Sequence, residues 1–179
     1  MGRLFFYVYI LVESFLLGLY TQEINMVAFS DYLEKNLLNH VFRSDSFTKP
    51  TEISIALTSG VPEDSMTGAT LIEMPTGING SGTGYGRVSM GSPFEDGDLT
   101  WSLTGEDDGA GSGVIRNSGQ IVFSTALIDW GWVSGVAVLD NGVFGSGNVL
   151  LHAELTNPRI IYTGDNVKFD MGTLEISFK

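Results

Sequence analysis

The sequence contains no cysteine, so it forms no disulfide bonds, no thiolate metal sites and no cysteine nucleophile. Histidine is also scarce, and the 2 that are present lie far apart, which leaves the usual catalytic and zinc-binding arrangements few side chains. Positive charge is scarce too, because 9 lysines and arginines stand against 21 acidic residues, for a formal charge of -12. Nucleic-acid binding needs a clustered basic face, so we expect no nucleic-acid partner.

What the chain has instead is glycine and apolar surface. The 23 glycines among 179 residues are about twice the ordinary share, and apolar residues make up 43%. That apolar content excludes wholesale disorder, and the length suits one domain with a substantial core. Composition therefore predicts a glycine-rich β domain but names no chemistry.

Residues 1–26 differ from the remainder of the chain. The run LFFYVYILVESFLLGLY at residues 4–20 is an apolar run broken by Glu13 and Gly18, and it is marginal for a membrane span, which needs about 20 apolar residues. No signal-type cleavage sequence follows it. Three interpretations stay open: translation that starts at Met26 or Val27, a hydrophobic arm that packs on a neighbouring subunit, or a membrane or signal segment, the least favoured of the three.

A helix is predicted at residues 29–43. Apolar side chains recur there at steps of three and four, and Ser30 stands where it can cap the helix. Pro50 disfavours helix in the residue before it, so the helix ends earlier. His40 lies in this helix and is interpreted as a structural or surface residue.

After Pro50 the pattern changes to short runs of alternating apolar and polar residues, bounded by Gly, Asn, Asp or Pro. Eight or nine such runs predict a mainly β fold, an antiparallel β-sandwich or jelly-roll preceded by the one short amphipathic N-terminal helix, as a domain at 27–179. In the run 51–58, one face is expected to be buried and the other exposed. Buried positions are expected to include Ile53, Ile55, Leu57, Val122, Val136, Val138, Leu150, Ile176 and Phe178.

Motifs for chemistry are missing from the sequence. The glycine-rich stretch at 77–90 has no phosphate-loop pattern and leads into a strand, and no G-x-S-x-G is present. Acidic runs at 95–98 and 106–108 could hold calcium or serve a glycosidase, but solvated loops are the favoured interpretation. His152 alternates within a strand and is interpreted as structural. We therefore expect no enzyme, no catalytic residue, no cofactor and no metal.

The sequence Asp129-Trp130-Gly131-Trp132 allows two interpretations. Its aromatic rings could form a ligand platform, or they could seal one end of the sandwich, since large aromatic side chains carry much of a core's area. The second interpretation is favoured.

The order of segments resembles a known family. These segments are AFSDYLEKNLLNHVF at 28–42, GTGYGRVSM at 82–90, NSGQIVFSTALIDWGW at 117–132 and GNVLLHAEL at 147–155. They are similar to the "DYLEN-LLDHVF", "GGYAR", "ITFP-ATADWG" and "GNLLFWGAL" segments of small tailed-bacteriophage virion structural proteins, labelled tail-fibre-like or head decoration proteins. Residues 1–26 have no counterpart in that pattern, and the acidic insertion at 94–112 is longer than usual.

The resemblance implies a non-enzymatic virion structural protein. A capsid cement or decoration protein that bridges major capsid protein subunits on the capsid exterior is favoured, with a tail or tail-fibre-associated protein as the alternative. A carbohydrate-binding module or glycan-degrading domain that uses the acidic loops and Trp101 is the alternative of a different class. Partners are then the major capsid protein or other virion proteins, and a homo-oligomer is expected, a trimer in preference. The candidate interface residues are Phe29, Leu33, Leu37 and Phe42 of the helix and Phe5, Phe6 and Tyr7 of the N-terminal segment.

Overall fold

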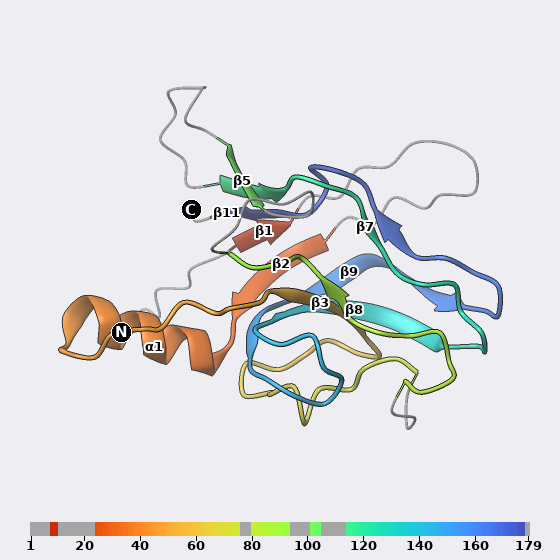
Figure 1. Cartoon of the computed structure of the whole chain (residues 1–179), viewed down its shortest axis with the longest axis horizontal. Helices are drawn as coiled ribbons and strands as arrows, with labels where there is room; N and C mark the ends of the chain where they lie inside the picture. The colour runs from red at the N-terminus through yellow and green to blue at the C-terminus, as the bar shows by residue number, and fades with distance from the viewer. Residues whose placement is uncertain (1–7, 11–23, 76–79, 94–100, 105–113, 178–179) are drawn as a thin grey trace.

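The computed structural model describes residues 8–10, 24–75, 80–93, 101–104 and 114–177 (Figure 1). Its elements form a mainly β fold with antiparallel pairing throughout the named sheets, as the sequence predicts. The helix is α1 (Asp31–Phe42). The strands are β1 (Val8–Ile10), β2 (Ile24–Phe29), β3 (Ser54–Thr58), β4 (Val88–Ser89), β5 (Trp101–Thr104), β6 (Val114–Asn117), β7 (Ile121–Val122), β8 (Gly131–Leu139), β9 (Val149–Ile161), β10 (Lys168–Phe169) and β11 (Glu175–Ser177).

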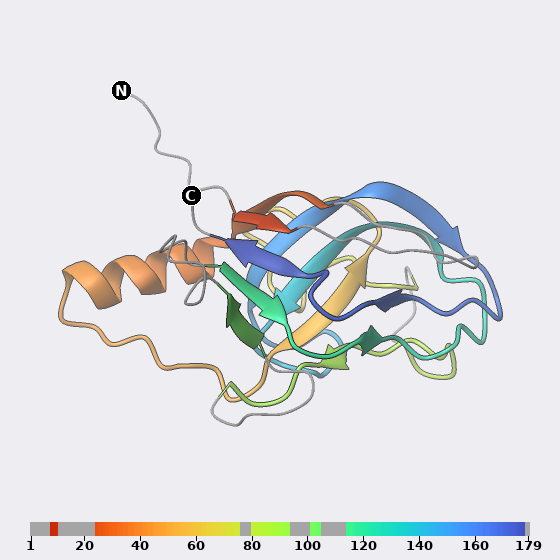
Figure 2. The same ribbon diagram turned by 90° about the horizontal axis from the view of Figure 1, so that it is seen from above.

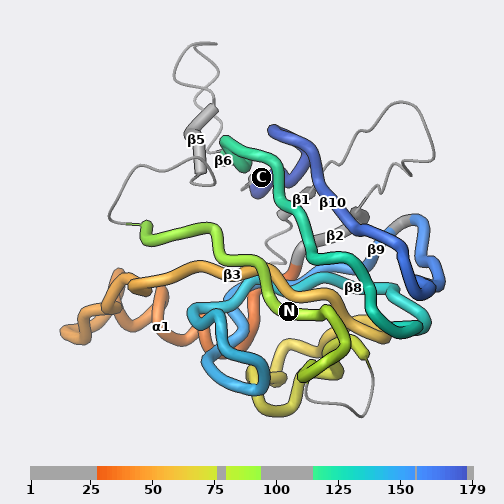
Figure 3. The backbone as a smooth tube through the Cα atoms, turned by 45° about the vertical axis from the view of Figure 1, so that its right-hand side comes forward, coloured from red at the N-terminus to blue at the C-terminus, as the bar shows by residue number. Residues whose placement is uncertain are grey.

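The strands form two layers in a sandwich-like arrangement. A six-stranded sheet in the order β1-β2-β9-β8-β3-β4 is the larger layer, and two small sheets, β10-β7 and β11-β6-β5, face it. Figure 2 shows the small sheets along one side of the large one, and Figure 3 shows the same separation from another angle. The predicted sandwich is therefore confirmed at the level of layers and strand direction.

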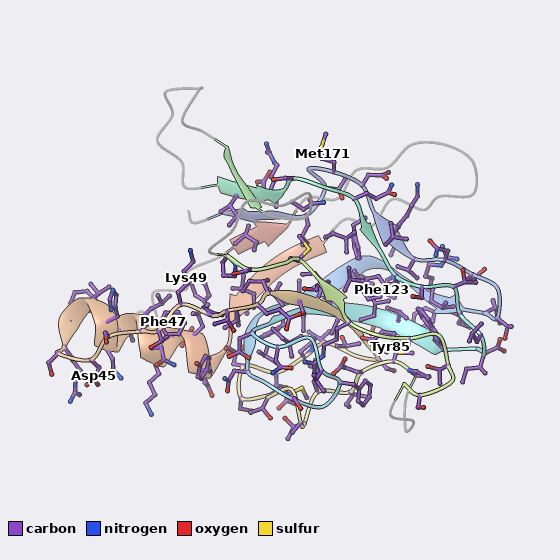
Figure 4. The ribbon with its side chains drawn as sticks, in the orientation of Figure 1. Asp45, Phe47, Lys49, Tyr85, Phe123 and Met171 are labelled. Carbon is purple, nitrogen blue, oxygen red and sulfur yellow. The ribbon has the colours of Figure 1, made fainter. Side chains whose placement is uncertain are left out.

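The main core lies between these layers. Phe123 and Phe169 come from the small sheet and its edge, and their rings meet at 63° with centroids 6.4 Å apart. Phe123 also stacks on Tyr85 at 6.2 Å, and Figure 4 shows both rings inside the body. Of the positions predicted to be buried, Ile55, Leu57, Val136, Val138, Leu150 and Ile176 are buried.

Three predicted core positions have other outcomes. Val122 is exposed, because the β7 alternation turns Ile121 and Phe123 inward, so that prediction is wrong by one residue of register. Ile53 is half-buried against the core, and Phe178 lies outside the described residues.

Strand β3 is buried on both faces, not on one as the sequence predicts. Its second face meets the segment at 59–75, which covers the far side of the large sheet (Figure 1). A second apolar cluster forms there, in which Ala56 packs with Leu71 and Leu139. The main core covers Ile55 and Leu57 on one face and the segment at 59–75 covers Ala56 on the other, so β3 has no solvent face.

The chain reaches the large sheet before the predicted domain start at residue 27. Strand β2 begins at Ile24 and pairs with β9, from Ile24 opposite Leu155 to Phe29 opposite Leu151. The strand therefore continues across the expected boundary, and Phe29 is its last residue and not the first residue of the helix.

Candidate functional site

Helix α1 projects from one end of the β body (Figure 1). Ser30 caps it as predicted: its hydroxyl oxygen accepts the backbone N–H of Leu33 at 3.2 Å, and its own N–H donates to the Leu150 carbonyl at 3.1 Å. The Ser30 hydroxyl also donates to the Val149 carbonyl. The helix start is thus fastened to β9, yet the helix contains no buried residue.

The outer half of α1 presents an apolar face to solvent. Leu38, Val41 and Phe42 are 58%, 64% and 79% exposed. Their spacing of three and four residues places them on one side of the helix. We call these three residues the helix face. An exposed, contiguous apolar set of this kind is typical of an interaction surface.

The predicted interface residues differ in their exposure to solvent, which increases toward the outer end of the helix. Phe29 is buried in the core, Leu33 is half-buried against it, and Leu37 is half-buried. Phe42 is the most exposed of the four predicted helix residues. Phe5, Phe6 and Tyr7 lie outside the described residues. Leu38 and Val41 are not among the predicted interface residues, although both belong to the same helical periodicity and are exposed like Phe42.

The segment at 43–50 runs back beside the helix, and Figure 4 labels three of its residues. Phe47 meets Tyr32 edge to face with ring centroids 6.4 Å apart, and its backbone N–H donates to His40 Nδ1 at 3.2 Å. Lys49 Nζ donates to the carbonyl of Pro93. The contacts of Phe47 hold the helix against the segment at 43–50, and the Lys49 bond holds that segment against the body. Both favour a defined orientation for the helix face.

The two tryptophans of the predicted aromatic motif have different positions. Trp130 is buried, and its indole N–H donates to the Thr83 carbonyl at 2.9 Å, so this ring seals the core as favoured above. Trp132 is 52% exposed. Residues two apart in a regular strand share a side, but Gly131 between them has φ +93°, in the left-handed region that glycine adopts readily. The turn at Gly131 accounts for one ring pointing inward and the other outward.

Trp132 borders a surface cleft of about 610 Å³ at the end of β8 and β9. Tyr162, 55% exposed, lies on the same cleft. Arg159 and Asp165 also line it and form an ion pair with Nη2 3.6 Å from Oδ2. The remaining lining residues are Asn157, Pro158 and Ile160.

A charged pair is fully buried beneath the loops. The guanidinium of Arg87 contacts both carboxylate oxygens of Glu73, with Nε at 3.1 and 3.0 Å, and donates from Nη1 to the carbonyls of Asn141 and Ser146 at 2.7 and 2.8 Å. The Tyr85 hydroxyl donates to the Glu73 carboxylate at 3.2 Å. Burial and, to a smaller extent, the negative charge of Glu73 raise the pKa of Tyr85 well above 10.0. Because the Arg87 and Glu73 side chains are shut off from solvent and hydrogen-bonded to each other and to two loop carbonyls, we interpret the cluster as a link between loops.

His152 lies on β9, as predicted, with its side chain buried. Its Nε2 is 3.0 Å from Asp64 Oδ1. Burial lowers the pKa of His152 below the ordinary 6.5, and the hydrogen bond and charge of Asp64 oppose this shift without reversing it. The unfolded chain therefore takes up a proton at this residue more readily than the folded chain does.

We expect the stability of the protein to respond to pH through His152. Because the pKa of His152 is lower in the folded state, its contribution to the free energy of unfolding is fully present above about pH 6.5. That contribution falls as the pH drops below this value, until the pH passes the folded-state pKa. Urea unfolding from pH 7.5 to 5 should show His152→Gln with a flatter profile than the wild type over that window. The control is His40→Gln, at an exposed histidine. If the free energy of unfolding of His152→Gln depends on pH as steeply as that of the wild type, His152 is not the source of the pH dependence.

The remaining predicted sites are the two acidic runs and Trp101. The acidic runs at 95–98 and 106–108 lie outside the described residues, and the side chain of Trp101 lies outside them too. Among the residues that the structure does describe, no three acidic or histidine side chains gather as a metal site would require. In that same part of the chain, no helix has the length and apolar character to cross a membrane.

Fold and surface together define a small, mainly β protein with a projecting apolar helix, an aromatic surface cleft and a buried charge cluster that links its loops. The sequence model of the Gp80 family, described as podophage GP4 fiber I protein gp80, matches residues 28–177. The chain belongs to this family. No curated protein matches the chain.

Family membership confirms the resemblance found in the sequence: the family is one of bacteriophage virion structural proteins with tail-fibre-like members. A structural family is also consistent with the expectation that the chain is not an enzyme. The match begins at residue 28, within β2 and directly before α1, so it covers the helix and nearly all of the β body.

Proposed function

We propose that this protein is a fibre component of a tailed-phage particle and that the helix face attaches it to a neighbouring virion subunit. The observation that carries the proposal is the exposure of Leu38, Val41 and Phe42 on a helix that is capped and fastened at its base. The family's description as a fibre protein supports the fibre assignment over the capsid one favoured from sequence.

The energetic argument concerns apolar area. Covering a fully exposed leucine, valine or phenylalanine side chain contributes about 1.5–3 kcal/mol each. The three side chains of the helix face therefore offer enough gain to anchor a subunit, if a neighbour's apolar surface meets them. Copies of this chain could also cover the helix face of one another. We propose a trimer, in which closed rotational symmetry brings three equivalent helices together.

Exchange of the helix face for polar residues tests this function. The triple variant Leu38→Gln, Val41→Gln and Phe42→Gln is expected to fold normally, since exposed substitutions change stability by about 0.5 kcal/mol or less and glutamine favours helix. Complementation of a phage that lacks the gene should give at least about tenfold fewer copies per purified particle than the wild type, by quantitative mass spectrometry.

The matched control removes the same kind of surface elsewhere. Leu127, Val143 and Met171 are similarly exposed apolar residues on loops of the β body. Their triple glutamine variant should enter particles at the wild-type level. Equal incorporation of both triple variants would contradict the role of the helix face, and light scattering that shows a folded, monomeric full-length chain would contradict the trimer.

The capsid cement role remains a second candidate, because an exposed apolar helix would also suit a clamp over capsomer junctions. It predicts a different place in the particle and a different defect: heads that lose stability to heat or chelation when the protein is deleted. A fibre component instead predicts stable heads and impaired adsorption.

A further inference from the structure

The cleft bordered by Trp132 is at the other end of the body from α1, where β8 begins and β9 ends (Figure 1). Its base is formed by cross-strand neighbours. Trp132 stands opposite Ile160 in the β8–β9 ladder, and Tyr162, just past the end of β9, lines the same cleft as both. Two exposed aromatic rings thus flank an exposed isoleucine on one surface.

An irregularity of β9 shapes the wall of this cleft. Between the pairs Val133–Arg159 and Gly135–Glu154, β8 has the single residue Ser134 where β9 has residues 155–158. This bulge carries Asn157 and Pro158 onto the cleft. Bulges commonly redirect side chains next to functional sites, and proline within a sheet is largely confined to edges and bulges.

The turn that carries Tyr162 is held on several sides. Tyr162 N–H donates to Asp165 Oδ2 at 3.0 Å, and Gly164 N–H donates to the Ala126 carbonyl at 2.8 Å. Asp129 accepts both the N–H and the hydroxyl of Thr163 at 2.8 Å, and these bonds lower the pKa of Asp129. A surface that is already ordered loses little conformational entropy when a ligand binds, so this turn is suited to recognition.

The chemistry of the cleft points to a sugar. The face of an aromatic ring carries partial negative charge and attracts the C–H face of a pyranose, for which Trp132 and Tyr162 provide two platforms. Asn157 and the Arg159–Asp165 pair place planar polar groups at the wall, where paired hydroxyls can form hydrogen bonds. The charges of that pair cancel, which favours an uncharged ligand.

Size and shape also favour a small ligand over a protein partner. A volume of about 610 Å³ falls within the range of roughly 300–1,000 Å³ usual for small-molecule sites. A protein surface would more often meet a broad patch such as the helix face. We propose that the cleft at Trp132 and Tyr162 binds a neutral oligosaccharide of two or three sugar units.

Binding of the full-length protein to an array of neutral and acidic bacterial surface oligosaccharides tests this proposal. We expect selective binding of neutral members, confirmed by titration calorimetry with the strongest one. Trp132→Ala and Tyr162→Ala should each weaken that affinity at least about tenfold. Val143→Ala, at an exposed apolar residue that lies neither on the cleft nor on the helix face, is the control and should bind sugar like the wild type.

The outcomes separate this site from the proposed attachment function. Trp132→Ala should still enter particles normally, whereas the triple variant of the helix face should still bind sugar. Absence of binding to every array member, or binding that both cleft variants retain, would overturn the proposal. Loss of particle incorporation in Trp132→Ala, without sugar binding by the wild type, would instead make the cleft a protein interface.

Discussion

Replacement of Arg87 by methionine is expected to lower the free energy of unfolding by about 3–5 kcal/mol, because it leaves the Glu73 carboxylate buried without its cation. Both side chains are almost wholly shut off from solvent, at 0% and 1% exposed. Arg87 also donates to the carbonyls of Asn141 and Ser146, so the loop at 140–148 loses its fastening to the strand region around residue 87. Urea unfolding of the purified protein measures this change.

Two further variants isolate the cause. In Arg87→Met with Glu73→Gln, no charge is buried and Tyr85 keeps an acceptor, so part of the lost stability should return. Lys168→Met removes the half-exposed ion pair with Asp170, whose 3.6 Å separation near the surface predicts a cost of about 1 kcal/mol or less. A single Arg87→Met variant that unfolds within about 1 kcal/mol of the wild type would contradict this account of the pair.

Truncation of Phe123 to alanine is expected to be comparably severe, at about 3–5 kcal/mol, because phenylalanine in a closed core leaves a cavity that cannot fully collapse. Phe123 is fully buried and joins the two layers through its contacts with Tyr85 and Phe169. The loss should therefore weaken the whole sandwich, and thermal unfolding followed by circular dichroism measures it.

The neighbouring Val122→Ala variant is the control. Val122 is exposed on the same strand region, so its truncation should change stability by about 0.5 kcal/mol or less. The comparison also tests the register of β7 directly. If Val122→Ala is the more damaging of the two, the inward and outward faces of this strand are exchanged.

Local signals in the sequence were sufficient for the elements they encode. Ser30 marks the start of α1 because its hydroxyl can reach a backbone N–H three residues later, and the structure has this bond. Alternation identifies β8 and β11, where Val136, Val138 and Ile176 are buried. Phe29 fitted the helical spacing equally well but lies before the cap, so it ends β2 instead.

Features that depend on distant pairing could not be predicted in this way. The cleft exists because β8 and β9 pair with a bulge that brings Trp132 beside Tyr162, and no local pattern states that register. The sequence showed Trp132 as an aromatic candidate but offered no reason to join it to Tyr162. Glu73 and Arg87 are 14 residues apart in the sequence and lie in different loops. No local periodicity indicates that these two oppositely charged residues form a pair.

The burial of both faces of β3 has the same origin. Alternation in that run correctly selects Ile55 and Leu57, but the second face is covered by the segment at 59–75, which packs there only in the folded chain. Sequence patterns describe one strand at a time, whereas the number of layers around a strand is a property of the whole fold.

Quantitative mass spectrometry of heads and tails separated from purified phage particles tests the central claim most directly. The proposed fibre role predicts that the protein is found with the tails, at a copy number consistent with a symmetric oligomer, and is depleted from the heads. Recovery with the heads alone would contradict that role and support the capsid cement alternative. Absence from both fractions of an intact particle would contradict a structural place in the virion altogether.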